Sequence, residues 1–322
     1  MILYGAAALA GICGLMWGAD RFVEGAARLA RRLGISPLIV GLTVVSFGTS
    51  LPELLIAVTA TFMGHPDVAV GNVVGSNVAN ICLILGTASL FRPLLIQSSL
   101  IHREYPALVA VSVLAWLMAK DGVFSRFEGL ILLGAMALFL GWMVQSAKQG
   151  HVDKLVSEAS ETPEPAQKEG LGRPVTYLVM GLVCLSVGSR LLVWGGVGMA
   201  RAFGVSELVI GLTLVALGTS LPELATSVAG AIKKEDDIAV GNVVGSNLFN
   251  TLAILGIPAT LVPLRVSSEA FHRDFPVMLL ATFLLWPVCR SWKAGRQGRV
   301  NRLEGGALAA GYLAYMTYLF VH

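Results

Sequence analysis

Long apolar blocks alternate with short polar segments along the whole chain. No Asp, Glu, Lys or Arg occurs at residues 68–91 or 238–264. Runs of about 18 or more such residues predict helices that cross a membrane. We expect ten spans, near residues 2–19, 37–62, 68–91, 105–119, 127–146, 174–194, 207–232, 238–261, 275–289 and 303–320. The first and sixth continue into Gly- and Ala-rich segments, so those two helices are expected to be longer.

Composition supports the same class of protein. Of the 322 residues, 55% are hydrophobic and only 13% are charged, whereas a soluble domain is about a quarter charged. The four cysteines all lie in apolar runs and none forms a CxxC pair, which favours packing over metal binding. The chain is therefore expected to be an all-α polytopic membrane protein.

Two stretches of the chain occur twice. GLTVVSFGTSLPEL at residues 41–54 returns as GLTLVALGTSLPEL at 211–224, and AVGNVVGSN at 69–77 returns unchanged at 239–247. Both pairs are separated by 170 residues, which divides the ten spans into two halves of five. An odd number of spans per half places the second half upside down in the membrane. Such inverted repeats are common in secondary transporters, with ion sites near the midplane.

This spacing predicts three segments. Residues 1–146 form the first five-helix repeat, 147–173 a flexible linker rich in Pro and Glu, and 174–322 the second, inverted repeat. With the N-terminus outside, 17 of the 23 Lys and Arg residues fall in inside loops. The excess of basic residues on the cytoplasmic side predicts that both termini are outside and the linker is cytoplasmic. No organelle-targeting feature is present, which favours the plasma membrane of a prokaryote, its inner membrane.

Each copy of the first motif carries one acid, Glu53 or Glu223, one step after a proline. A carboxylate at membrane depth is costly, so these two residues are candidates for a functional site. A proline within a helix frees the carbonyl four residues earlier. We therefore expect each helix to kink and to present a free carbonyl oxygen at Gly48 and at Gly218.

The residue types around the acids indicate the kind of cation. Thr49 and Thr219 precede the glutamates by four residues, which places them on the same helix face. Carboxylates, hydroxyls and carbonyls are hard oxygen ligands, suited to Ca²⁺ or Na⁺ and not to soft metals. Two facing carboxylates carry a charge of −2, which one Ca²⁺ or a larger number of Na⁺ ions would neutralise. Without a cation, at least one of them is expected to take up a proton.

The second motif adds neutral ligands at four-residue intervals on one helix face. They are Asn72, Ser76 and Asn80 in the first copy and Asn242, Ser246 and Asn250 in the second. The GxxxG pairs at residues 71–75 and 241–245 permit close helix approach. We expect four helices to pack around a small polar centre, in which Asn72 and Asn242 either bind the ion or join the helices.

At these residues the chain resembles the sodium/calcium exchanger family of the calcium/cation antiporter superfamily. The resemblance covers the whole ten-span layout. It implies two inverted five-helix halves that hold ions between the second, third, seventh and eighth helices. It also implies a central calcium site formed by Glu53, Glu223 and the backbone oxygens of Thr49 and Thr219.

The same resemblance implies two flanking sodium sites. One consists of Ser46, Thr49, Ser50, Glu53 and Ser76, and the other of Ala216 through its carbonyl, Thr219, Ser220, Glu223 and Ser246. Asn80 and Asn250 match the middle position, where some relatives have an Asp. Two neutral residues there lower the negative charge and argue against dependence on potassium.

The family mechanism is alternating access, in which Na⁺ entry drives Ca²⁺ exit while the first and sixth helices slide. The glycines at residues 11–18 and 188–198 suit such sliding contacts. A proton/calcium exchanger that uses the same carboxylates and a cation channel are the alternatives. The chain lacks HExxH, GxSxG and nucleotide-binding motifs, so we expect no enzyme. The expected partners are Ca²⁺, Na⁺ or H⁺ and the lipid bilayer, without a cofactor or nucleic acid.

Overall fold

The computed structural model describes residues 1–148, 170–204, 216–290 and 297–321, and most of them are helical. The first half contains α1 (Ile2–Leu33), α2 (Pro37–Val40), η1 (Gly41–Val45), α3 (Ser46–Thr49), α4 (Leu51–Phe62), α5 (Pro66–Val78), η2 (Ala79–Leu85), α6 (Gly86–Phe91), η3 (Leu100–Glu104), α7 (Tyr105–Met118), η4 (Ala119–Asp121) and α8 (Arg126–Lys148). The second half contains α10 (Gly172–Ala202), α12 (Ala216–Thr219), α13 (Leu221–Lys233), α14 (Asp236–Phe249), η6 (Asn250–Ile254), α15 (Gly256–Leu261), η7 (Ala270–Asp274), α16 (Phe275–Cys289) and α17 (Arg302–Val321).

Local sequence signals explain where several helices begin and end. α4, α5 and α16 each carry a proline at the first or second position, where the missing N–H costs no helical hydrogen bond. α1 ends in Arg31, Arg32 and the left-handed Gly34, whose φ is 66°. Basic residues in a last turn and a left-handed glycine after it both stabilise the end of a helix.

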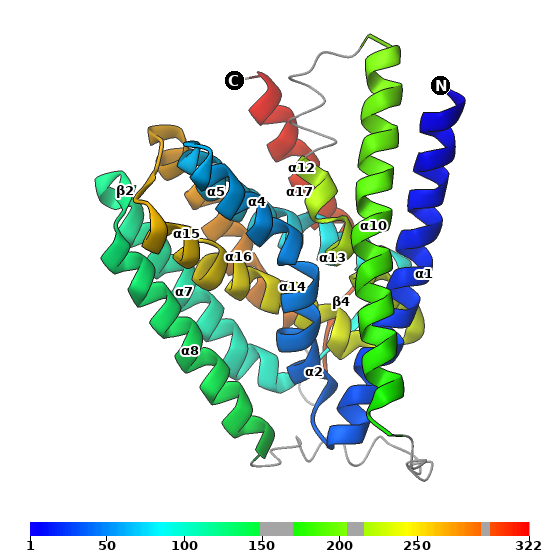
Figure 1. Cartoon of the computed structure of the whole chain (residues 1–322). Helices are drawn as coiled ribbons and strands as arrows, with labels where there is room; N and C mark the ends of the chain where they lie inside the picture. Colours follow the sequence, from blue (N-terminus) through cyan, green and yellow to red (C-terminus); the bar gives the residue numbers. More distant parts are fainter. Residues whose placement is uncertain (149–169, 205–215, 291–296, 322) are drawn as a thin grey trace.

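Four short strands connect the two halves of the chain. β1 (Leu94–Ile96) pairs antiparallel with β4 (Gly298–Val300), and β2 (Val123–Phe124) pairs with β3 (Leu264–Arg265). In Figure 1 the β2 label lies at the left edge of the molecule and the β4 label lies near α14 and α1. We call each of these two strand pairs a ribbon. The all-α fold expected from the sequence did not include them.

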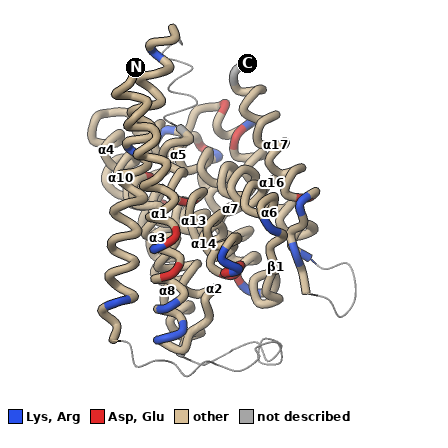
Figure 2. Tube along the Cα trace, turned by 90° about the vertical axis from the view of Figure 1, so that its right-hand side faces the viewer, with Lys and Arg blue, Asp and Glu red and all other residues tan. Residues whose placement is uncertain are grey.

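Six described helical stretches are long and apolar enough to cross a membrane. The pair Pro37–Thr49 and Leu51–Phe62 adds a seventh if it is counted as one span bent by 44°. The chain is therefore a multi-pass membrane protein, and the number of ten inverted spans stays a prediction. The expected span 207–232 begins outside the described residues, and α16 has only 15 residues. Figure 2 shows the charged residues as short patches on a trace that is otherwise uncharged.

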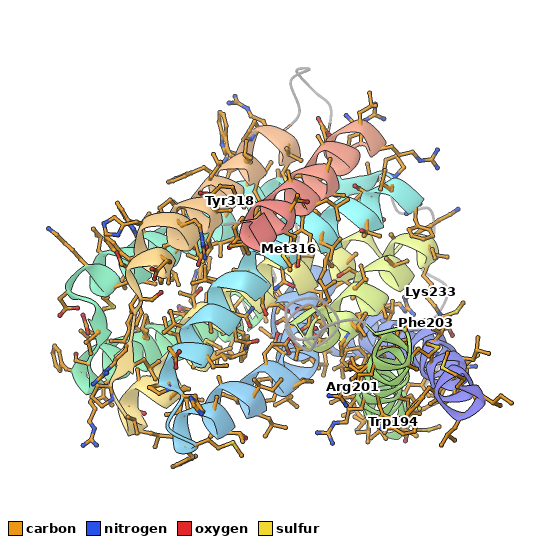
Figure 3. The ribbon with its side chains drawn as sticks, turned by 90° about the horizontal axis from the view of Figure 1, so that it is seen from above. Trp194, Arg201, Phe203, Lys233, Met316 and Tyr318 are labelled. Carbon is orange, nitrogen blue, oxygen red and sulfur yellow. The ribbon has the colours of Figure 1, made fainter. Side chains whose placement is uncertain are left out.

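The two longest helices, α1 and α10, have 32 and 31 residues. The sequence predicted that both would extend beyond their apolar spans. They lie side by side in Figure 1 and again in Figure 3, where Trp194, Arg201 and Phe203 mark α10. A Cβ added to Gly11 would stand 2.7 Å from the carbonyl oxygen of Gly188. The described glycines of these helices thus pack α1 against α10. The sliding role expected for these glycines stays a prediction.

The helices that carry the GNVVGSN motifs lie at the centre. The most apolar window of Asp236–Leu261 is fully buried, and 72% of that of Pro66–Phe91 is buried, against about a third for α1 and α10. A Cβ on Gly245 would stand 2.5 Å from the carbonyl oxygen of Leu42, so α14 packs directly on η1. This contact confirms the close approach predicted for residues 241–245. The same prediction for residues 71–75 was wrong, because a Cβ on Gly71 or Gly75 would have no described neighbour within 4 Å.

The predicted linker at residues 147–173 falls mainly on 149–169, which lie outside the described residues. α8 extends to Lys148 and α10 begins at Gly172. Each helix therefore enters the predicted linker by two residues.

Candidate cation-binding site

Each copy of the GTSLPE motif breaks a helix one residue before its Leu-Pro-Glu triplet. Ser50, between α3 and α4, has φ −85° and ψ 5°, and Ser220, between α12 and α13, has φ −87° and ψ 5°. Glu53 and Glu223 consequently lie in the first turns of α4 and α13. The positive end of a helix dipole stabilises a carboxylate in that position.

Each of the two glutamates accepts a hydrogen bond from a serine in the other half of the chain. The Ser50 hydroxyl donates to Glu223 Oε1 at 3.0 Å, and the Ser220 hydroxyl donates to Glu53 Oε1 at 3.4 Å. Glu53 is 1% exposed and Glu223 is 2% exposed. In each carboxylate, Oε2 is buried and has no hydrogen-bond partner among the described residues.

Two amides repeat this pattern on the GNVVGSN helices. Asn80 lies in the π-helical turn η2, and Asn250 begins the π-helical turn η6, a geometry that is frequent at functional sites. Their Nδ2 atoms donate to Asn247 and Asn77, each at 3.0 Å. Their Oδ1 atoms are buried and accept no hydrogen bond within the described part of the chain. Four buried acceptor oxygens are thus left over, two from each half.

Most of the remaining candidates are also buried near these groups. Ser46, Thr49, Ser76 and Ser246 are at most 6% exposed. The Ser46 hydroxyl donates to the Leu42 carbonyl at 2.7 Å, which leaves its oxygen lone pairs available. Ser246 Oγ has no partner among the described residues.

The structure says less about the last two candidates, Thr219 and Ala216. Thr219 is half-buried at the end of α12. Ala216 begins α12, and its side chain lies outside the described residues. The predicted role of its carbonyl therefore stays a prediction, as do the roles of the other candidates.

The Asn242 amide connects neighbouring elements. Its Nδ2 donates to the Glu223 carbonyl at 3.2 Å and to Ser227 Oγ at 3.0 Å. Its Oδ1 accepts from the Thr49 hydroxyl at 3.1 Å. Asn242 thus joins α14 to α13 and α3, which is one of the two roles expected for it.

One expectation about the kinks was wrong. The Gly218 carbonyl is not free, because the Ser189 hydroxyl of α10 donates to it at 2.6 Å. The residue that precedes Ser189 by 170 positions is Ala19, which has no hydroxyl to donate. The two copies of the motif therefore differ in how their kinks meet the long helices.

Comparison with known proteins now identifies the chain. Its sequence matches the family profile described as "Sodium/calcium exchanger protein" over residues 4–145 and 174–321. The chain belongs to the sodium/calcium exchanger family. It is similar to the inner membrane protein YrbG of Escherichia coli K12, with 40% identity over 99% of this chain and 98% of YrbG. It is also similar to the sodium/calcium exchanger MaX1 of Methanosarcina acetivorans, with 30% identity over 97% of both chains.

A solved structure supports the same assignment. The sodium-calcium exchanger NCX_Mj, soaked with Na⁺ and Ca²⁺, matches with a TM-score of 0.84 and 30% identity over 99% of both chains. Members of this family are secondary transporters and not enzymes. The chain is accordingly a cation/Ca²⁺ antiporter, which confirms the family and the non-enzymatic class predicted from the sequence.

Three residues that support the candidate amides were not predicted from the sequence. Asn77 and Asn247 hold the amides of Asn250 and Asn80, and Thr251 holds Asn77. Asn77 and Asn247 end the repeated GNVVGSN motif, and this repetition was an available signal. Thr251 has no such signal, because the position 170 residues earlier is Ile81.

Proposed function

We propose that this antiporter exchanges Na⁺ for Ca²⁺ and that it holds Ca²⁺ between Glu53 and Glu223. The observation that carries the proposal is the reciprocal arrangement of the two buried carboxylates. Each accepts a serine hydroxyl from the opposite half and keeps one buried oxygen without a partner among the described residues. Carboxylate oxygens with neutral amide oxygens beside them form the donor set that Ca²⁺ prefers.

Charge explains why such a site would exchange cations rather than simply bind them. An uncompensated buried charge costs several kcal/mol, so two carboxylates without a cation make an unfavourable centre. One Ca²⁺ neutralises both, and Na⁺ ions do so in greater number. Competition between the two cations for the same carboxylates couples the entry of one to the exit of the other.

The flanking sodium sites would share the same glutamates. The first half of the chain, which carries Glu53, contributes Ser46, Ser50 and Ser76. The second half, which carries Glu223, contributes Ser220 and Ser246. These serines are all at most 6% exposed. Because Asn80 and Asn250 are neutral, we propose that the site needs no potassium to balance its charge.

The same proposal includes the arrangement in the membrane. Residues 1–146 and 174–322 would form inverted repeats, with both termini outside and residues 147–173 in the cytoplasm. The similarity to a protein named for the inner membrane favours the same location here. Alternating access would be carried by α1 and α10, whose glycines pack them against each other.

Calcium flux into proteoliposomes tests the proposal. Vesicles loaded with Na⁺ and diluted into Na⁺-free ⁴⁵Ca²⁺ should accumulate calcium. Glu53→Gln or Glu223→Gln should reduce that uptake by about 100-fold or more, since removing one partner of a buried charge pair costs about 3 kcal/mol or more. Glu269→Gln, which changes an exposed acid, is the matched control and should keep normal uptake.

The driving ion is tested by separate gradients. Uptake that follows a Na⁺ gradient at equal pH on both sides supports sodium coupling, and added K⁺ should not increase it. Uptake driven by a pH gradient without Na⁺ would instead assign the same carboxylates to proton exchange. Normal sodium-driven uptake by either glutamate variant would refute the assigned site.

A further inference from the structure

The amides that flank the glutamates are held by a hydrogen-bonded network that spans the two halves. Asn80 Nδ2 donates to Asn247 Oδ1, and Asn250 Nδ2 donates to Asn77 Oδ1, each at 3.0 Å. The two bonds are equivalent under the 170-residue repeat. In both bonds, Oδ1 of the partner asparagine accepts a hydrogen bond from Nδ2 of Asn80 or Asn250. The Oδ1 atom of Asn80 or Asn250 therefore points away from that partner. Asn77 and Asn247 thus determine which atom of each neighbouring amide is left for an ion.

The two halves differ, however, in what the Nδ2 atoms of Asn77 and Asn247 contact. Asn77 Nδ2 donates to Thr251 Oγ1 at 2.9 Å and contacts Met278 Sδ at 3.5 Å. Thr251 in turn donates to the Asn247 carbonyl at 3.0 Å. The positions 170 residues before Thr251 and Met278 are Ile81 and Leu108, which offer no acceptor. Accordingly, Asn247 Nδ2 is buried without a partner among the described residues.

This difference decides how firmly each amide is oriented. Turning over the Asn77 amide would break its hydrogen bond to Thr251 and would set two N–H₂ groups against each other at Asn250. Turning over the Asn247 amide loses no hydrogen bond of its Nδ2, and Asn80 can turn with it. The cost of leaving a buried polar group unpaired therefore opposes reorientation much more strongly on one side of the site.

We propose that Thr251, acting through Asn77, is a positioning residue that holds the Asn250 amide oxygen toward the ion site. The opposite amide, Asn80, lacks this second support because Ile81 replaces the threonine. The two halves thus contribute one fixed and one adjustable neutral ligand. The inference rests on the proposed function, since it assumes that the free oxygens of Asn80 and Asn250 face the cation.

The hydroxyl of Thr251 can be removed with little change in shape. Thr251→Val should raise the apparent KM for ⁴⁵Ca²⁺ by about three- to tenfold, the effect expected for losing one buried hydrogen bond, with a smaller change in kcat. Thr251→Ser keeps the hydroxyl and should stay within about twofold of the unchanged protein. An equal KM in the valine variant and the unchanged protein would overturn the inference, as would an equal increase in both variants.

The repeat supplies a second test that does not depend on the folding of the valine variant. Ile81→Thr offers an acceptor to Asn247 Nδ2 and should lower the KM for Ca²⁺, whereas Ile81→Val, which adds no hydroxyl, should not. An Ile81→Thr variant that binds Ca²⁺ no better than Ile81→Val contradicts the inference. The glutamate variants separate this result from a failure of the proposed function, because they lose uptake whether or not Thr251 positions Asn250.

Discussion

The contact between α14 and η1 offers a direct test of how closely the halves pack. A Cβ at Gly245 would stand 2.5 Å from the Leu42 carbonyl oxygen and 2.6 Å from Ser46 Oγ. Favourable contacts between heavy atoms lie near 3.5–4.0 Å, so Gly245→Ala requires the two helices to separate by roughly 1 Å. Overpacking of this kind costs about 1–3 kcal/mol.

Alanine also has a higher helix propensity than glycine, by about 1 kcal/mol, and this gain must be removed from the comparison. Gly71→Ala supplies the control, because Gly71 is exposed on α5 and has no described atom within 4 Å of its added Cβ. The propensity gain is common to both variants. Their difference in the free energy of unfolding should therefore approach the packing cost of about 1–3 kcal/mol.

Thermal unfolding of the purified protein in detergent measures this difference. The Tm of Gly245→Ala should lie a few degrees below that of Gly71→Ala. Because the displaced side chain is Ser46, the alanine at 245 should also weaken Na⁺ activation of calcium uptake. Equal Tm values and equal Na⁺ dependence in the two variants would show that α14 and η1 are not in close contact.

Two further predictions concern polar contacts outside the site. Arg92→Met removes a 2.7 Å ion pair from Asp236, which is 8% exposed, and should destabilise the protein by about 1.5–3 kcal/mol in thermal unfolding. Asp20→Asn removes the more exposed ion pair between Asp20 and Lys233, which are 2.7 Å apart, and should cost about 1 kcal/mol or less. A larger loss than for Arg92→Met would contradict this ranking. Ser189→Ala removes the bond to the Gly218 carbonyl and should cost about 1 kcal/mol. A Tm unchanged from the parent would refute that bond.

Duplication marks the centre of the candidate site in the sequence. A glutamate in an apolar run carries a high free-energy cost of burial. Glu53 and Glu223 both occur in the same sequence, GTSLPEL. The four-residue spacing of Ser76 and Asn80 placed both on one helix face, and both are buried. These features depend only on helix periodicity and on the cost of burying a charge, so they can be inferred without coordinates.

Other features depend on how the helices meet, which periodicity does not determine. The Gly218 carbonyl accepts from Ser189 only because α10 presents its serine to that kink. The orientation of the Asn77 amide depends on Thr251, a position where the two halves differ. The four strands have only two or three residues each, too few for a pattern of alternation to distinguish them from loops.

The two ribbons have a mechanical consequence. Each one joins a strand from the first half of the chain to a strand from the second by main-chain hydrogen bonds. Tilting the two halves against each other as rigid blocks would break these hydrogen bonds, at about 1 kcal/mol for each bond. We therefore expect conformational change to involve elements that neither strand pair joins, and α1 and α10 are such elements.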